Sequence, residues 1–334
     1  MTRPRLLLVA TGGTIAGVAP TAASTLSYAP ASLGADSLIA SVPALGDLAD
    51  ITTETPFSTG SQHMTSAYWL TLAARVRQAI VDPTIDAVVI THGTDTLEET
   101  ALFLDLTCPR DKAVVLTGAM RPATALGADG PMNLYAAAAL AVNPASRGAG
   151  AIVLMNDQAF GPDRAAKVHT SRVDAFIARS AMPLALMLNG QPVWQVPAAI
   201  AAARRPSLAA HFASLPAALP RVDLLAQQVD ADPAIIDWCL QQGARGIVVA
   251  GTGHGSLSHP IEAALGKASD KGCLVVRASR ISDGPVMHGA SVDDDRFGFI
   301  AAGFVTPHKS RLLLSLLIAA GLDREAARAV FASF

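Results

Sequence analysis

The sequence contains few charged residues, few aromatic residues and few cysteines. Of its 334 residues, 16% are charged and 5% are aromatic, and 25 basic residues against 27 acidic ones give a net charge of −2. The lack of a basic run or a basic amphipathic stretch argues against nucleic acid as a partner. The three cysteines, Cys108, Cys239 and Cys273, form no CxxC motif, and their odd number favours a reducing compartment. We therefore expect a cytoplasmic protein without a metal or other cofactor.

Long hydrophobic runs are also missing. The apolar run Leu312–Ala320 is well short of the roughly 20 residues needed to cross a bilayer. Arg3 and Arg5 before "LLLVA" give the N-terminus a faint likeness to a signal peptide, but this run is short and ends in "TGGT" without a small-residue cleavage site. We interpret it as the first buried strand and expect no membrane partner.

Apolar residues are nevertheless abundant and fall into short runs that alternate with helical patterns. They make up 51% of the chain, enough for a sizeable core in one large or two modest domains. Continuous Val/Leu/Ile runs predict strands buried on both faces. The predicted strands are Arg5–Ala10, Ala87–Thr91, Ala113–Thr117, Ala151–Met155, Val222–Ala226, Gly246–Ala250 and Cys273–Arg277. The predicted helices are Ala67–Val81, Glu98–Leu106, Met132–Val142, Pro233–Gln242, Pro260–Lys267, Lys309–Ala320 and Arg324–Ser333.

This alternation predicts an α/β protein with two domains. The first is a larger N-terminal domain, residues 1–190, with an open and mostly parallel sheet flanked by helices. The proline- and alanine-rich segment Met182–Pro220 interrupts the alternation, so residues 191–220 are predicted to be a linker. A smaller C-terminal α/β domain, residues 221–334, follows.

The residues that follow the predicted strands are rich in hydroxyls, amides and glycine. Ligands of open α/β sheets bind beyond the carboxyl ends of the strands, so these segments are the candidate site. In "THGTDTLEET", Thr96 is the expected helix N-cap, with Glu99 three residues later in capping-box position. Thr94 and Asp95 are not needed for the helix, and they predict a polar site in this loop.

The segment "TGGTIAG", residues 11–17, allows two interpretations. Its glycines could cradle a phosphate, or they could present a threonine hydroxyl as a nucleophile on a tight turn. The spacing matches neither G-x-G-x-x-G nor a P-loop, since no lysine follows. Residues 18–31 contain one aromatic residue, Tyr28, among Pro, Ala, Ser and Thr, a composition that fits a mobile lid over a small substrate.

Two long segments resemble the signature segments of the bacterial L-asparaginases. They are "ATGGTIAG" and "ITHGTDTLEETALFLDLT", and the resemblance continues in unbroken order through "GSQHMT", "LTGAMRPATALGADGPMNLY", "GIVVAGTGHGSL" and "VVRASR". It covers nearly the whole chain, and two such segments together are highly specific. The resemblance implies hydrolysis of L-asparagine to L-aspartate and ammonia.

The resemblance also implies roles for individual residues. Thr14 corresponds to the primary nucleophile of the family, and Tyr28 to the flap tyrosine that hydrogen-bonds it. Thr94 and Asp95 correspond to the second threonine and its neighbouring carboxylate. Lys167 corresponds to the lysine that completes a Thr-Asp-Lys triad.

Three further positions correspond to substrate-binding residues. Ser61 and Gln62 match residues that hold the α-carboxylate and α-amino group of the substrate, and Ser256 matches a position that reaches the site of a neighbouring subunit. The resemblance accordingly implies a homotetramer built from two intimate dimers.

The chemistry is consistent with these roles. Amide hydrolysis needs a nucleophile, a base and a site for the oxyanion. The side chain of a free lysine has a pKa of about 10.4. Burial beside Thr94 would lower that pKa, and the negative charge of Asp95 would oppose the shift. Either Thr14 is acylated and Thr94 delivers water, which we take as the default, or a polarised water attacks the amide directly.

The sequence departs from the family at two positions. His63 follows Ser-Gln where relatives commonly have aspartate or asparagine. Ser291 stands where many relatives have a glutamate, supplied by the neighbouring subunit, that helps to hold the α-amino group. Because the longer side chain of glutamine depends more on this anchor, we expect weak activity on glutamine. Two other functions remain possible on the sequence alone. One is a binding module for a nucleotide or another small ligand without catalysis, and the other is an amidotransferase subunit with an asparaginase core.

Overall fold

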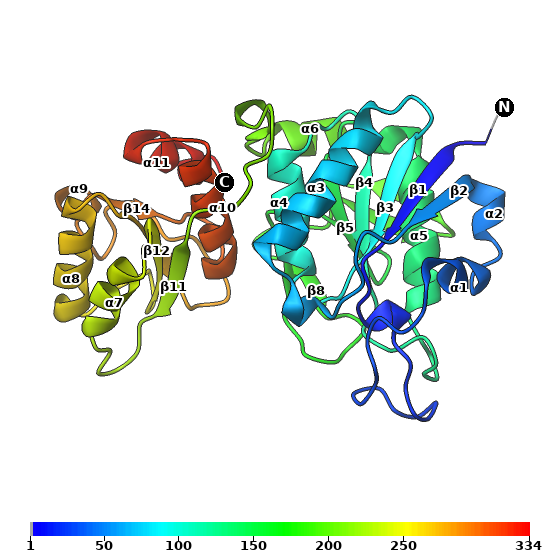
Figure 1. Ribbon diagram of the computed structural model, residues 1–334, viewed down its shortest axis with the longest axis horizontal. Helices are drawn as coiled ribbons and strands as arrows, with labels where there is room; N and C mark the ends of the chain where they lie inside the picture. Colours follow the sequence, from blue (N-terminus) through cyan, green and yellow to red (C-terminus); the bar gives the residue numbers. More distant parts are fainter. Residues whose placement is uncertain (1–2) are drawn as a thin grey trace. The chain divides into compact units, whose positions relative to one another are not determined.

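The computed structural model describes residues 3–334 and divides into two compact units (Figure 1). The first unit ends at Ala209, and the second runs from Ala210 to Phe334. Each unit has a sheet and a core of its own. Within the described residues, no helix is both long and apolar enough to cross a membrane.

The first unit contains an eight-stranded sheet in the order β10-β9-β6-β5-β4-β3-β1-β2. Its strands are β1 (Arg5–Ala10), β2 (Asp50–Glu54), β3 (Ala87–Thr91), β4 (Val114–Thr117), β5 (Ala151–Met155), β6 (Gln158–Phe160), β9 (Ala185–Leu188) and β10 (Gln191–Trp194). The five strands from β2 to β5 pair in parallel, and β6, β9 and β10 extend one edge in antiparallel fashion. A separate two-stranded ladder joins β7 (Ala165–Lys167) to β8 (Phe176–Ala178).

Helices cover both faces of this sheet (Figure 1). The six helices of the unit are α1 (Ala35–Ala40), α2 (Leu45–Leu48), α3 (Ser66–Val81), α4 (Leu97–Thr107), α5 (Gly130–Val142) and α6 (Ala198–Ala203). The alanine-rich α5 packs with α1 and α2 on the sheet face that carries Leu6, Leu8 and Val89. Helices α3 and α4 lie side by side on the other face.

The second unit contains a parallel four-stranded sheet in the order β11-β12-β13-β14. Its elements are β11 (Val222–Ala226), α7 (Ala234–Gln241), β12 (Gly246–Gly251), α8 (His259–Asp270), β13 (Leu274–Ser279), α9 (Asp294–Phe297), β14 (Phe299–Ala301), α10 (Pro307–Ala319) and α11 (Arg324–Ala332). Helices α7 and α8 pack beside each other, and their buried residues share one cluster with β12 and β13. Arg277 and Asp294 form a fully buried ion pair between β13 and α9, with Nη2 2.6 Å from Oδ2.

The predicted fold class is confirmed, with a larger, mostly parallel sheet followed by a smaller α/β unit. The predicted strands recur as β1, β3, β4, β5, β11, β12 and β13, with ends that differ by at most two residues. The segment predicted as a linker, residues 191–220, begins with β10, which pairs with β9 of the large sheet, and continues into the short helix α6. The first unit extends to Ala209 because these residues pair with β9 and pack on its core.

Candidate functional site

The candidate site lies at the carboxyl ends of the parallel strands of the first unit. Backbone hydrogen bonds join the loops that leave neighbouring strands, from Thr11 N to Thr91 O over 3.0 Å and from His92 N to Thr117 O over 2.8 Å. A third bond, from Gly13 N to Thr59 O over 3.1 Å, brings in the loop that follows β2. Loops separated by long stretches of sequence are therefore fixed against one another by their own backbones.

Two glycines allow these loops to approach closely. Gly13 has a φ of +83°, and a Cβ there would stand 2.4 Å from the Cα of Gly93. A Cβ on Gly93 would in turn stand 2.5 Å from Ser61 Oγ. No side chain fits at either position without displacing backbone or Ser61, so glycine is required for the loops of Thr14, Ser61 and Thr94 to meet.

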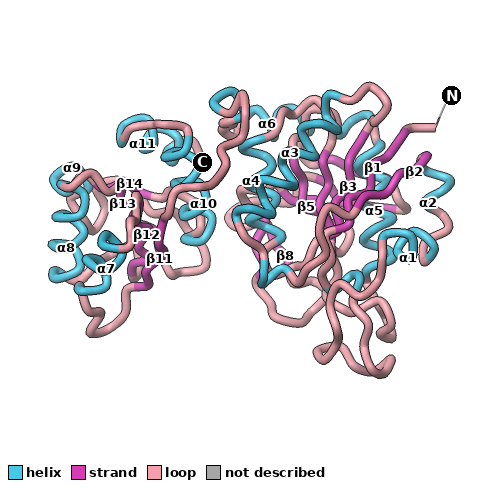
Figure 2. Tube along the Cα trace, viewed as in Figure 1, coloured by secondary structure: helices cyan, strands magenta, loops and turns pink. Residues whose placement is uncertain are grey.

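Thr14 and Tyr28 form a direct hydrogen bond. Thr14 lies in a 3-10 turn directly after Gly13 and is 8% exposed, and its Oγ1 is 2.7 Å from Tyr28 Oη. Tyr28 belongs to the long, largely irregular connection between β1 and α1, which extends beyond the sheet as a flap (Figure 2). Paired backbone bonds between Val18 and Ala29, of 3.0 and 2.9 Å, close the base of this flap. The tyrosine is thus held over the threonine.

Thr94, Lys167 and Asp95 form a second hydrogen-bonded group. Lys167 Nζ donates to Thr94 Oγ1 over 2.8 Å and to Asp95 Oδ1 over 2.6 Å. The lysine side chain is 17% exposed and that of Asp95 59%, so the pair lies between the protein interior and solvent. Lys167 ends the short strand β7, and the Glu98 carboxylate in α4 accepts its backbone N–H over 2.8 Å. Glu98 therefore anchors the strand that carries the lysine.

Ser61 is bonded to the loop that carries Thr94 and Asp95. Its Oγ accepts the backbone N–H of Asp95 over 3.2 Å, and its carbonyl accepts the hydroxyl of Thr96 over 3.0 Å. Thr96 is the N-cap residue of α4, as predicted, but its hydroxyl donates to the neighbouring loop and makes no capping bond with a helix amide. Thr96 joins two site loops where the sequence pattern indicated a purely local role.

Gln62 and Ser256 lie outside this hydrogen-bonded group. Gln62 is exposed, and its side chain folds back over Gly60. Ser256 belongs to the second unit, where backbone bonds of 3.0 and 2.7 Å with Thr252 form the turn between β12 and α8. The first unit thus brings together six of the eight predicted site residues: Thr14, Tyr28, Ser61, Thr94, Asp95 and Lys167.

Comparisons with known proteins agree with this arrangement. The family model described as "Asparaginase, N-terminal" matches residues 5–199, and "Glutaminase/Asparaginase C-terminal domain" matches residues 221–331. The chain belongs to the asparaginase family. L-asparaginase 2 of Escherichia coli (strain K12) is 38% identical over 328 residues, covering 98% of this chain and 92% of that protein. Glutaminase-asparaginase of Acinetobacter glutaminasificans is 37% identical over 322 residues, covering 94% of each.

A solved structure is similar along its whole length. The crystal structure described as a probable cytoplasmic L-asparaginase from Campylobacter jejuni has a TM-score of 0.91 at 37% identity, and the match covers 99% of this chain and 100% of that one. The resemblance identified from the sequence is therefore confirmed.

The sequence did not predict two residues, Asp129 and Asn133, that support the site of this asparaginase-family chain. Asp129 accepts the backbone N–H groups of Met120 and Arg121, each over 2.9 Å, and Asn133 donates to Gly118 O over 3.0 Å. These two residues at the start of α5 fix the loop after β4. A sequence pattern offers little signal for them, because an Asp and an Asn near a helix N-terminus also fit ordinary capping.

His92 is buried beside the site. It is 1% exposed, its Nδ1 is 2.7 Å from Gly93 O, and its Nε2 is 3.1 Å from Thr100 Oγ1. Desolvation by burial lowers the pKa of His92 from 6.5 to about 4, and the hydrogen bond to Gly93 opposes this shift. The imidazole is therefore neutral at pH 7.

We expect this depressed pKa to make stability sensitive to acid. Well above pH 6.5 the His92 ring is neutral in both the folded and the unfolded chain, so protonation of His92 does not reduce the free energy of unfolding there. As the pH falls from 6.5 towards 4, the unfolded chain gains a proton that the folded chain does not, which costs up to about 3 kcal/mol. The urea midpoints of the wild type and His92→Asn at pH 7 and 4.5 test this. The wild type should lose more stability than the variant, and equal losses would contradict the assignment.

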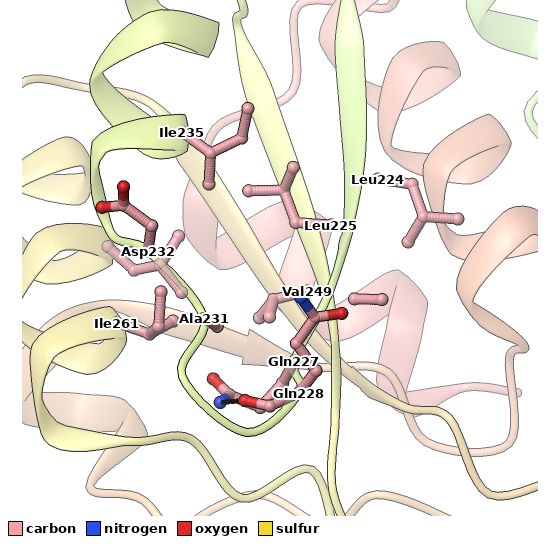
Figure 3. Close-up of a pocket in the computed structure, with 11 residues that line it drawn as sticks. Leu224, Leu225, Gln227, Gln228, Ala231, Asp232, Ile235, Val249 and Ile261 are labelled. Atoms are coloured by element: carbon pink, nitrogen blue, oxygen red, sulfur yellow. Dashed lines mark hydrogen bonds between the residues drawn. The ribbon is translucent and has the colours of Figure 1, made fainter.

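The second unit of this asparaginase-family chain contains a cavity of different character. It has a volume of about 360 Å³ and lies between β11, β12, α7 and α8, as the close-up shows (Figure 3). Its described lining is mostly apolar, with Gln227, Gln228 and Asp232 as its polar side chains. It offers no hydroxyl–lysine pair like that of Thr94 and Lys167. Among residues 3–334, no group of three or more His, Cys, Asp or Glu side chains is arranged to hold a metal ion.

Proposed function

We propose that this protein hydrolyses L-asparagine to L-aspartate and ammonia, with Thr14 as the nucleophile. The main support for the proposal is that two threonines in the first unit are each hydrogen-bonded to a different side chain that can transfer a proton. Thr14 is hydrogen-bonded to Tyr28 and Thr94 to Lys167, in a chain of the asparaginase family. A nucleophile and a separate activating group are what a two-step amide hydrolysis needs.

In the first step, Thr14 Oγ attacks the side-chain amide carbon of asparagine. The hydroxyl proton passes to Tyr28 as the tyrosine proton moves to the amide nitrogen, so the C–N bond breaks and ammonia leaves. The 2.7 Å bond between Thr14 and Tyr28 supports this transfer. The product of the step is an ester between Thr14 and the aspartyl group.

In the second step, water attacks the ester carbonyl. One water proton goes to Thr94 Oγ1 as the Thr94 proton passes to Lys167 Nζ. The other reaches Thr14 through Tyr28 Oη, 2.7 Å from Thr14 Oγ1, as the C–O bond to Thr14 breaks and aspartate leaves as its carboxylate. For this the lysine must first share a proton with Asp95, and the 2.6 Å distance between Nζ and Oδ1 supports such sharing. If the same Thr94–Lys167 pair polarised water for direct attack, no ester would form. Added hydroxylamine would then yield no aspartyl hydroxamate.

The head group of the substrate is zwitterionic and needs two kinds of partner. Asp95 supplies a counter-charge for the ammonium, while Ser61 with nearby backbone N–H groups binds the carboxylate. Gln62, one residue further along the same turn, also contacts the head group. Ser256 acts in the site of a neighbouring subunit.

Ammonia release is the direct test of the proposed reaction. The purified protein is incubated with L-asparagine, without added metal or nucleotide, and ammonia and aspartate are measured together. Equal amounts of the two products are expected. An inactive wild type that binds asparagine without cleaving it would contradict the proposal and favour a binding module.

We expect Ser291→Glu to change the choice between asparagine and glutamine. Ser291 is exposed and has a φ of +67°, in the loop between β13 and α9. A glutamate there would supply a counter-charge for the α-ammonium in the site of a neighbouring subunit. We expect KM to fall for both amides, by about two- to fivefold for an exposed charge pair, and more for glutamine, whose longer side chain depends more on this anchor.

This expectation is checked by measuring kcat/KM for both amides in the wild type, in Ser291→Glu and in Ser291→Gln. The glutamine variant is the control, because it matches glutamate in size but carries no charge. The wild type should be a weak glutaminase, and Ser291→Gln should resemble it. A wild type that turns over glutamine as well as asparagine would show that another group, such as Asp293, already supplies the charge.

We expect the protein to be a homotetramer of two intimate dimers. The low content of charge, 16%, and exposed apolar side chains such as Leu26 and Leu126 support burial between subunits. Light scattering should give a mass near four times the 34.3 kDa of one chain, and no less than a dimer. A fully active monomer would contradict this expectation.

The cytoplasm is the compartment that we propose. The three cysteines are free and buried, and the Campylobacter jejuni relative is described as probably cytoplasmic, although a Haemophilus influenzae relative is described as periplasmic. Fractionation of the native host, followed by detection of the protein, tests the compartment.

A further inference from the structure

A buried chain of hydrogen bonds leads from helix α3 to the loop of Thr94. Trp69 in α3 donates from Nε1 to Thr100 Oγ1 in α4 over 2.8 Å, and Thr100 Oγ1 lies 3.1 Å from His92 Nε2. His92 Nδ1 then lies 2.7 Å from the carbonyl of Gly93. Helices α3 and α4 lie side by side (Figure 1), and the three side chains are at most 5% exposed. Water therefore does not compete for these bonds.

The chemistry of the atoms fixes the direction of every bond. A carbonyl only accepts, so His92 Nδ1 carries the proton that reaches Gly93. In a neutral ring Nε2 must then accept, and the Thr100 hydroxyl must donate to it. The hydroxyl oxygen in turn accepts from Trp69. Each group has one assigned role, and the lowered pKa of His92 is consistent with the neutral ring.

The end of this chain controls one peptide plane of the site. The Gly93–Thr94 peptide is rigid, so fixing its carbonyl also fixes the direction of the Thr94 N–H and the position of the Thr94 Cα, from which the side chain extends. The Gly93 backbone lies against Gly13 on one side and Ser61 on the other. Rotation of this peptide would move Thr94 Oγ1 away from Lys167 Nζ, now 2.8 Å away.

We propose that Trp69, Thr100 and His92 are positioning residues that hold the Gly93–Thr94 peptide in its reactive orientation. None of them touches the substrate. They act through the carbonyl of Gly93, and their effect is on the chemical step more than on substrate binding. The inference rests on the proposed asparagine hydrolysis and adds to it a set of residues in α3 and α4.

The first test uses Thr100→Val, which keeps the shape of the side chain and removes the hydroxyl, and Thr100→Ser, which keeps the hydroxyl. We expect Thr100→Val to lower kcat by about 10- to 100-fold, the scale of a misplaced reacting group, with KM changed less than threefold. Thr100→Ser should restore most of kcat. Thr107→Val is the matched control, since Thr107 is buried in the same helix and donates to Phe103 O.

The second test uses the histidine. His92→Asn can still donate to the Gly93 carbonyl from a similar position, whereas His92→Leu cannot. We expect the leucine variant to lose kcat as Thr100→Val does and the asparagine variant to retain most of it. Spectra of the protein labelled with ¹⁵N-histidine should show a neutral ring protonated at Nδ1 that disappears in His92→Asn.

The outcomes separate this inference from the proposed function. A wild type that releases no ammonia from asparagine overturns the proposed reaction, and the positioning role with it. An active wild type in which Thr100→Val matches Thr107→Val, or in which KM alone changes, overturns the positioning role and leaves the reaction standing. A His92 ring protonated at Nε2 overturns the direction of the chain.

Discussion

Replacing Thr14 by alanine is expected to lower kcat by roughly 10⁴- to 10⁶-fold, the scale seen when an activated nucleophile is lost from a catalytic triad. The reason is geometric: Thr14 Oγ1 is the hydroxyl that Tyr28 Oη contacts at 2.7 Å, directly after the tight turn at Gly13. Alanine removes the attacking oxygen and little else, so the unfolding midpoint should change only slightly. Steady-state kinetics with asparagine, together with urea unfolding, measure both effects.

Two further variants control this result. Thr14→Ser keeps a hydroxyl and should retain part of the activity. Thr11→Ala removes a neighbouring buried hydroxyl that donates to Thr91 O over 2.8 Å, and it should cost far less kcat than Thr14→Ala. If Thr14→Ala kept a kcat near that of the wild type, the nucleophile would have to be another group.

Lys167→Met is expected to be comparably damaging, by roughly 10⁴-fold or more in kcat. Methionine has a similar length but no amine, so Thr94 loses the group 2.8 Å from its hydroxyl and Asp95 loses its 2.6 Å partner. Activation of the hydrolytic water through Thr94 would then fail. Thr94→Ala and Asp95→Ala should follow closely, because each breaks the same chain at another point.

Lys112→Met provides the matched control for the lysine. Lys112 lies in the same unit and donates from Nζ to Ala79 O over 3.0 Å, away from the threonines. Its loss should affect stability more than kcat. Activity of Lys167→Met within tenfold of the wild type, with Lys112→Met unchanged, would exclude the lysine from the chemical step.

The large sheet could be predicted from the sequence because its central strands are buried on both faces. Every residue of β3 and β5 is buried, and apart from Thr91 at the end of β3 every one is apolar, a pattern typical of a strand covered on both faces. Short strands do not carry this signal. β10, "QPVW", alternates between exposed and half-buried residues in a proline-rich segment, and its pairing with β9 depends on the tertiary fold.

Some residues of the candidate site could likewise be placed from the sequence, and others could not. Thr14, Thr94 and Asp95 follow buried strands, so their position at one edge of the sheet could be inferred from the order of the elements. The position of Lys167 could not be inferred in this way. It ends a three-residue strand, and that strand is held by Glu98 of α4, a helix that lies far away in sequence. Its candidacy came from the family resemblance alone.

Hydroxyl partners were the least predictable feature. Thr96 had a plausible local role as a helix cap, yet its hydroxyl bonds to Ser61 O, a residue 35 positions away in sequence. Thr100 looked like an ordinary residue inside a helix, yet it bridges Trp69 and His92. A hydroxyl can donate and accept in many directions, and only the assembled loops select among them.

The close packing at Gly13 and Gly93 has a consequence for how the specificity of this protein can be altered. Because these two positions have no room for a side chain, they cannot be varied without moving the loops apart. Other residues of these loops can be substituted, because Gln62, His63 and the flap around Leu26 are exposed. A library aimed at new amides should therefore randomise the exposed flap residues around Leu26 and the turn after Ser61, and leave Gly13 and Gly93 as they are.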